Sequence, residues 1–222
     1  MITLPDFSQS FEYENSFYWT SDIFRMSKII AHYELFKISN NVPGHIVECG
    51  LFKGASFIRF ATFRHLFNNA NAKRMIGFDA FGTFPETAFE PDFAMRENFI
   101  AESGETGISE DQLMEVLRHK GCADNVDLVK GDVRNTVPNY IKENPSLKIS
   151  LLNIDVDVYE ATKVCIEELY DYVTVGGVII LDDYSNVFPG ANKAIDEFFT
   201  GRDVEIKRFP FSVTPCYTVK RG

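Results

Sequence analysis

The sequence lacks the features that mark several common classes of protein. It has only four cysteines, and no pair of them has the short spacing of a zinc site or a redox dithiol. No apolar run approaches the roughly 18 residues of a membrane span, and the N-terminus has no basic segment followed by an apolar core. We therefore expect reduced core thiols in a cytoplasmic protein without a membrane span.

Positive charge is also scarce. The 222 residues include 22 Lys and Arg against 32 Asp and Glu, which gives a net charge of −10. Nucleic acids and anionic membranes require a basic surface, so this balance disfavours both as partners. The length suits one well-buried domain. Within it, we expect residues 1–43 to form an N-terminal cover segment and helix, and residues 44–222 to form the main domain.

The segment from Ile149 to Tyr184 predicts a strand, a crossover helix and a second, parallel strand. Each strand is a continuous apolar run that ends on carboxylates, namely Asp155 and Asp157 after the first and Asp182 and Asp183 after the second. A right-handed crossover brings both strand ends to the same edge of the sheet. Carboxylates gathered without His or Cys suit magnesium, calcium or manganese better than zinc.

The rest of the chain alternates between strand and helix patterns. Apolar runs at 45–50, 73–79 and 126–131 predict strands, and helical spacing predicts helices at 20–39, 55–67, 109–117, 137–143 and 191–199. Residues 204–208 and 212–219 predict a closing hairpin, whereas residues 1–16 show no period and residues 80–108 predict a loop. The sum is an α/β fold with a doubly wound, mostly parallel sheet and a C-terminal antiparallel hairpin.

The junction between the first strand and its helix is a candidate cofactor site. Its glycines let the backbone approach a ligand, and the amides at the start of the helix can face an anion, although two glycines can also be simple turn residues. Asp79, at the end of the second predicted strand, is placed to accept hydrogen bonds from ribose hydroxyls. Together these features indicate an adenosine-containing cofactor.

Two cofactors share this recognition, and the residues favour one of them. Gly50 and Gly54 do not supply the three glycines of a dinucleotide fingerprint, and Glu48 disfavours a pyrophosphate. The methionine part of S-adenosylmethionine tolerates that acid, because its ammonium pairs with a carboxylate while its own carboxylate can bind Ser56 or helix amides. We therefore favour S-adenosylmethionine.

These motifs resemble the class I, metal-dependent O-methyltransferases and, more closely, the macrocin O-methyltransferase family of sugar-modifying enzymes. The likeness rests on Glu48-x-Gly50-x-Phe52-x-Gly54-x-Ser56 and on segments 78–85, 155–162 and 182–184. The resemblance implies a Rossmann-like methyltransferase fold, S-adenosylmethionine, a magnesium or manganese ion, and a homodimer. It also implies a cofactor site formed by Glu48, Gly50, Phe52, Gly54, Ser56, Asp79 and Asp132.

The resemblance also assigns roles at the carboxylate edge. It makes Asp155, Asp182 and Asp183 the metal ligands, and Asp157, one step beyond the metal strand, is our candidate for the proton acceptor. The lysine base of the catechol enzymes is replaced by Val158, and the histidine base of the sugar enzymes has no counterpart between His65 and His119. We therefore expect Asp155 and Asp157 to carry the catalytic roles.

The expected function is a metal-assisted O-methyltransferase acting on a hydroxyl of a small acceptor, such as a sugar of a glycan or natural product. Acceptor choice would depend on segments 1–20, 80–108 and 184–192. A metal-dependent glycosyltransferase using Asp155-x-Asp157 is one alternative, but it gives no role to Glu48, Gly50 or Asp79. A non-catalytic binding protein of the same fold is another, although carboxylates that converge without a cation repel one another.

Overall fold

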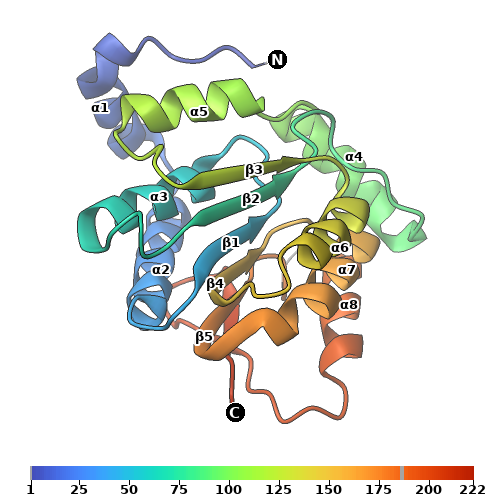
Figure 1. The fold of residues 1–222 in the computed structure, drawn as a ribbon. Coiled ribbons are helices and arrows are strands. Elements are labelled where there is room, and N and C mark those ends of the chain that lie inside the picture. Colours follow the sequence, from blue (N-terminus) through green and yellow to red (C-terminus); the bar gives the residue numbers. More distant parts are fainter. Residues whose placement is uncertain (1, 186–187) are drawn as a thin grey trace.

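A mostly parallel sheet forms the centre of the molecule (Figure 1). The computed structural model describes residues 2–185 and 188–222, and within them the sheet has seven strands in the order β3-β2-β1-β4-β5-β7-β6. Strands β1 to β5 are parallel, and β7 is antiparallel to both β5 and β6. The predicted α/β class and the C-terminal antiparallel hairpin are confirmed.

The strands are β1 (His45–Cys49), β2 (Met75–Asp79), β3 (Val126–Lys130), β4 (Ile149–Ile154), β5 (Val173–Leu181), β6 (Lys207–Arg208) and β7 (Cys216–Val219). The α-helices are α1 (Ser10–Thr20), α2 (Ile23–Ser39), α3 (Ala55–Phe67), α4 (Phe93–Ser103), α5 (Glu110–His119), α6 (Val133–Glu143), α7 (Tyr159–Leu169) and α8 (Pro189–Phe199). Short 3₁₀ turns are η1 (Phe7–Gln9), η2 (Glu90–Asp92) and η3 (Tyr170–Tyr172).

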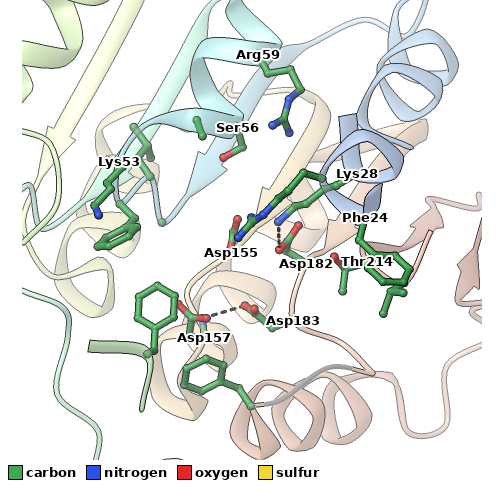
Figure 2. A pocket seen from close by; sticks show the side chains of 18 of the residues that line it. Phe24, Lys28, Lys53, Ser56, Arg59, Asp155, Asp157, Asp182, Asp183 and Thr214 are labelled. Atoms are coloured by element: carbon green, nitrogen blue, oxygen red, sulfur yellow. Dashed lines mark hydrogen bonds and ion pairs between the residues drawn. The ribbon is translucent and has the colours of Figure 1, made fainter. Parts of the chain in front are cut away.

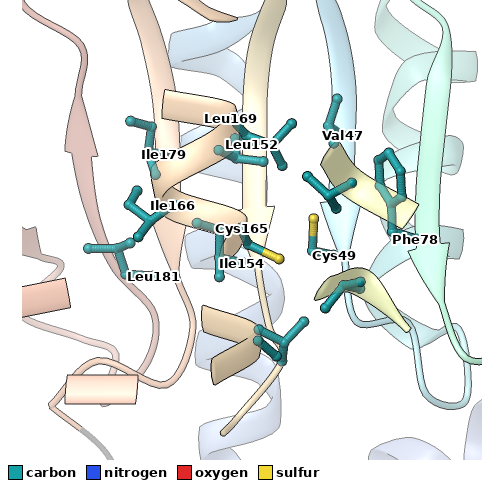
Figure 3. Packing of buried hydrophobic residues seen from close by; sticks show 14 of the residues in the cluster. Val47, Cys49, Phe78, Leu152, Ile154, Cys165, Ile166, Leu169, Ile179 and Leu181 are labelled. Carbon is teal, nitrogen blue, oxygen red and sulfur yellow. The ribbon is translucent and has the colours of Figure 1, made fainter. Parts of the chain in front are cut away.

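Helices cover both faces of the sheet because its central strands are apolar on both sides. In β4, Leu151 packs with α2, α3 and α5, whereas Leu152 and Ile154 pack with α6, α7 and α8. Figure 3 shows the second of these layers, in which Cys165 of α7 lies close to Cys49 of β1. Alternation along each strand therefore divides one continuous apolar run between two cores.

Two helices, α1 and α4, were not predicted. Neither α1 nor α4 contains a buried residue, so neither requires the apolar period from which a helix is read. The predicted loop at 80–108 is therefore wrong over Phe93–Ser103. The closing strands β6 and β7 are also shorter than predicted. The predicted acceptor segment 184–192 includes residues 186–187, which lie outside the described residues.

The local signals at α5 and the cysteine prediction agree with the structure. Ser109 caps α5, and it forms a capping box with Gln112, in which each side chain binds the other residue's backbone N–H. All four cysteines are free and buried. No helix in the described part of the chain is long and apolar enough to cross a membrane.

Candidate functional site

Two adjoining cavities open at the carboxyl ends of the parallel strands. The larger, about 550 Å³, is lined by Asp155, Asp157, Asp182 and Asp183 and is called the acidic cavity here. The smaller, about 310 Å³, is lined by Asp79 and Asp132 and is called the Asp79 cavity. Four residues line both cavities: Gly50, Phe52, Asp155 and Asp157. A ligand can therefore extend from one cavity into the other past the end of β1.

The loop between β1 and α3 depends on close backbone packing. Gly50 has φ +85°, and a Cβ placed on it would lie 1.7 Å from the backbone oxygen of Asp155. Only glycine permits this approach of the β1 and β4 ends. Gly54 lines neither cavity, and its left-handed backbone instead forms the N-cap of α3.

Asp79 supports this loop from the neighbouring strand. One carboxylate oxygen accepts the N–H groups of Leu51 and Phe52 at 2.7 and 3.0 Å, and the other accepts the N–H of Phe81 at 2.6 Å. Asp132, at the far side of the same cavity, caps α6 and binds the Arg134 guanidinium. Both residues line the Asp79 cavity; the sequence predicted a ribose contact for Asp79, and the family resemblance implied a cofactor contact for Asp132.

Glu48 occupies a different place from the one that its motif suggests. It is fully buried and lines neither cavity, and it accepts a hydrogen bond from the Ser56 hydroxyl. Burial raises the pKa of Glu48 to about 8 despite this hydrogen bond. Ser56 lines the acidic cavity, so Glu48 supports the cavity wall from behind.

Three carboxylates converge in the acidic cavity. Oxygen atoms of Asp155, Asp157 and Asp183 lie within 4.8 Å of one another, and the backbone N–H of Asp157 donates to Asp183 at 3.0 Å (Figure 2). Burial and the neighbouring carboxylates raise the pKa of all three side chains, and that of Asp157 reaches about 8. Ionising all three side chains together is therefore costly unless a cation neutralises their charge.

The fourth carboxylate, Asp182, is held by a helix outside the sheet. Lys28 of α2 binds Asp182 Oδ2 at 2.6 Å, and His32 Nε2 lies 3.8 Å from Oδ1. Burial opposes ionisation of Asp182, but the positive charge of Lys28 outweighs it and holds the pKa of Asp182 well below its usual range. Sequence analysis missed Lys28, because a lysine 154 residues away along the chain gives no local signal.

Aromatic side chains form another wall of the site, and they come partly from the segment that was predicted as a loop. Phe99 of α4 lies 5.2 Å from the ring of Phe52 and 4.9 Å from that of Phe84. Phe99 and Phe188 both line the acidic cavity. Arg59 of α3 also lines this cavity, and its Nη1 lies 2.9 Å from His32 Nδ1.

Comparison with known proteins identifies similar chains among O-methyltransferases. One, from Streptomyces olivaceus, is named 8-demethyl-8-(2,3-dimethoxy-alpha-L-rhamnosyl)-tetracenomycin-C 4'-O-methyltransferase and is 28% identical over 152 residues, which are 67% of this chain and 56% of the relative. Another, demethyldecarbamoylnovobiocin O-methyltransferase from Streptomyces niveus, is 29% identical over 177 residues, which are 75% of this chain and 62% of the relative. The matches thus span about three fifths of the length of these curated relatives.

A solved structure and a family model extend this similarity over most of the chain. The crystal structure of CalS11, described as a calicheamicin methyltransferase, superposes with a TM-score of 0.80 at 29% identity, over 95% of this chain and 85% of CalS11. The model of the family described as Macrocin-O-methyltransferase (TylF) matches residues 24–210. This match includes all the parallel strands and both cavities' carboxylates. The chain therefore belongs to the macrocin O-methyltransferase family.

Proposed function

We propose that this protein transfers a methyl group from S-adenosylmethionine to a hydroxyl of a small, sugar-containing acceptor. The observation that carries the proposal is the junction of the two cavities at Gly50, Phe52, Asp155 and Asp157. One cavity suits an adenosine and the other suits an acceptor beside a cation, so a methyl donor and a hydroxyl would meet where they join. The rhamnosyl group in the name of one relative supports a sugar as the acceptor.

We propose that the cofactor extends through both cavities. Asp79 and Asp132 would face its ribose and adenine, since Asp79 Oδ1 accepts only the N–H of Phe81 and retains a lone pair for a ribose hydroxyl. The free backbone amides at the start of α3, that of Ser56 included, would bind the methionine carboxylate. Glu48 would act through Ser56, whose hydroxyl it orients.

The carboxylates of the acidic cavity fit a divalent cation. They are hard oxygen ligands: Asp155, Asp157 and Asp183 converge within 4.8 Å, and Asp182, outside that group of three, has a buried Oδ1 without a hydrogen-bond partner among the described residues. We propose that Asp155, Asp182 and Asp183 hold magnesium or manganese. When bound, such an ion acts as a Lewis acid that orients a hydroxyl and lowers its pKa.

Side chains of the protein would accept the proton and exclude water. Asp157 lines both cavities and projects from a left-handed backbone with φ +59°, so its carboxylate is placed to accept the proton of the acceptor hydroxyl. Phe52, Phe99 and Phe188 supply an apolar wall that would exclude water from the transferring methyl group.

Binding calorimetry tests this function. We expect S-adenosylhomocysteine to bind the wild-type protein, and Asp79→Asn to weaken it by about tenfold or more, because the amide places a donor where the loop and ribose need an acceptor. Asp127→Asn is the matched control, since Asp127 carries the same side chain on β3 but pairs with Arg74 outside both cavities. Absence of binding by S-adenosylmethionine and S-adenosylhomocysteine, with and without magnesium, would overturn the proposal.

A further inference from the structure

Helix α2 extends two side chains toward one carboxylate of the acidic cavity. Lys28 and His32 are one helical turn apart, so they share a face of the helix. In Figure 2, Lys28 reaches from α2 to Asp182, and the Nζ–Oδ2 distance is 2.6 Å. Asp182 is only 4% exposed. A buried carboxylate at the end of β5 is thus bound by a side chain of the N-terminal helix α2.

Hydrogen bonding fixes which proton His32 presents to this carboxylate. Arg59 Nη1 lies 2.9 Å from His32 Nδ1, and because a guanidinium can only donate, Nδ1 must be the acceptor. The proton of the neutral ring is therefore on Nε2, which faces Asp182 Oδ1 across 3.8 Å. That distance is too long for a hydrogen bond, and both atoms lack a partner among the described residues. Within the described part of the chain, Lys28 is therefore the side chain that bonds directly to the Asp182 carboxylate.

We infer that Lys28 is a positioning residue that holds Asp182 while the metal site is empty and competes with the divalent ion for this carboxylate. The inference rests on the proposed function, because it concerns the affinity of the same metal site. Two cations cannot share one carboxylate without repelling each other at close range. Lysine suits the role, since its compact charge sits on a flexible stem that can swing away.

The competition has two consequences with opposite signs. Removing the ammonium removes the competitor, so the divalent ion should bind more tightly. Removing it also leaves Asp182 buried without a charged partner, so the protein without metal should become less stable. If Lys28 had only a structural role, its replacement would lower the stability of the protein and would not improve its affinity for metal.

Manganese titration by calorimetry tests the inference on the full chain. We expect Lys28→Met to bind Mn²⁺ about tenfold more tightly than wild type, and Lys28→Arg to remain close to wild type because the positive charge is retained. Lys53→Met is the matched control. Lys53 lines the same cavity, but its ammonium binds the backbone oxygen of Ser103 at 2.6 Å instead of a carboxylate. It should change Mn²⁺ affinity by less than about twofold.

A second substitution tests whether Asp182 is the shared group. In the Lys28→Met background, Asp182→Asn should abolish the gain in Mn²⁺ affinity. Equal or weaker Mn²⁺ binding by Lys28→Met, persistence of the gain in the double variant, or absence of Mn²⁺ binding by every variant would each overturn the inference. S-adenosylhomocysteine binding, measured on the same samples, separates these failures from failure of the proposed methyltransferase function.

Discussion

At the scale of single residues, Glu48 shows what a sequence motif predicts about a side chain and what it does not. Its place at the end of the first predicted strand was predictable from the sequence, which indicated a cofactor contact. Its complete burial behind Ser56 was not, because burial depends on what α2 and α3 bring over that face of the sheet. Asn153, its neighbour in register on β4, is a buried amide whose oxygen and nitrogen have no partner among the described residues.

The burial of Glu48 predicts a dependence of stability on pH. Its folded pKa is about 8, above the value of 4.5 for an unperturbed side chain. The stability that it contributes is therefore complete below pH 4.5, and it is lost as pH rises through about 8. Glu48→Gln removes this loss, so the variant should gain on wild type as pH rises, by a total of about 2–4 kcal/mol.

Urea denaturation at pH 5, 6.5 and 8 measures this difference in free energy of unfolding. Glu115→Gln is the matched control, because Glu115 carries the same side chain in an exposed position on α5. Parallel pH profiles for wild type and Glu48→Gln would contradict a raised pKa at Glu48.

At the scale of elements, predictability followed burial. The bounds of α3 were predicted from its sequence, and the central strands were recognised because each is an apolar run buried on both faces. Helices α1 and α4 bury nothing completely, so their sequences carry no helical period. The position of α4 depends instead on tertiary contacts of Asp92, a residue that the sequence analysis did not identify.

Asp92 attaches the start of α4 to two other helices. Its buried carboxylate accepts the N–H of Gly190, in the first turn of α8, at 2.7 Å and that of Tyr159, the first residue of α7, at 3.0 Å. Asp92→Ala would leave both donors unsatisfied, at a cost of about 3 kcal/mol in the free energy of unfolding. It should also speed hydrogen exchange across residues 90–103, which form a wall of the acidic cavity through Phe99.

Glu160→Ala provides the comparison for this prediction. Glu160 also holds the 80–108 segment, through the hydroxyl of Thr87 and the N–H of Ala88, but it is only partly buried. Its loss should cost less than about 1 kcal/mol, because water can replace it. If thermal denaturation and hydrogen-exchange mass spectrometry find the two variants equally affected, Asp92 does not fasten α4 in the way described.

At the scale of the whole molecule, some parts of the site could be predicted from the sequence and others could not. Carboxylates at strand ends were predictable, since parallel strands of one sheet must present those ends at one edge. The helix that covers that edge was predictable only as a cover. Its pairing of Lys28 with Asp182 depends on how α2 packs across β4 and β5, and this follows from the assembled fold rather than from any short segment.

The homodimer that the family resemblance implies stays a prediction, and α1 indicates where to test it. This helix lies outside the part of the chain matched by the family model, residues 24–210. It exposes several large side chains, including Phe11 at 76%, Tyr18 at 62% and Trp19 at 75%. Apolar surface of this extent is typical of an interaction site. If a second copy covers it, the sole tryptophan of the sequence lies in the interface.

Trp19 therefore reports on its own burial. We expect its fluorescence to shift to longer wavelength on dilution as the dimer dissociates, and we expect Trp19→Glu to be monomeric by light scattering, because an ionised carboxylate in an apolar interface is costly. Leu66→Glu, at a 63% exposed position on α3, is the control and should leave the assembly unchanged. A wild-type protein that is monomeric at micromolar concentration, or a Trp19→Glu variant with wild-type mass, would place α1 outside any interface between copies. The exposed aromatic residues would then be free to contact the acceptor or another protein.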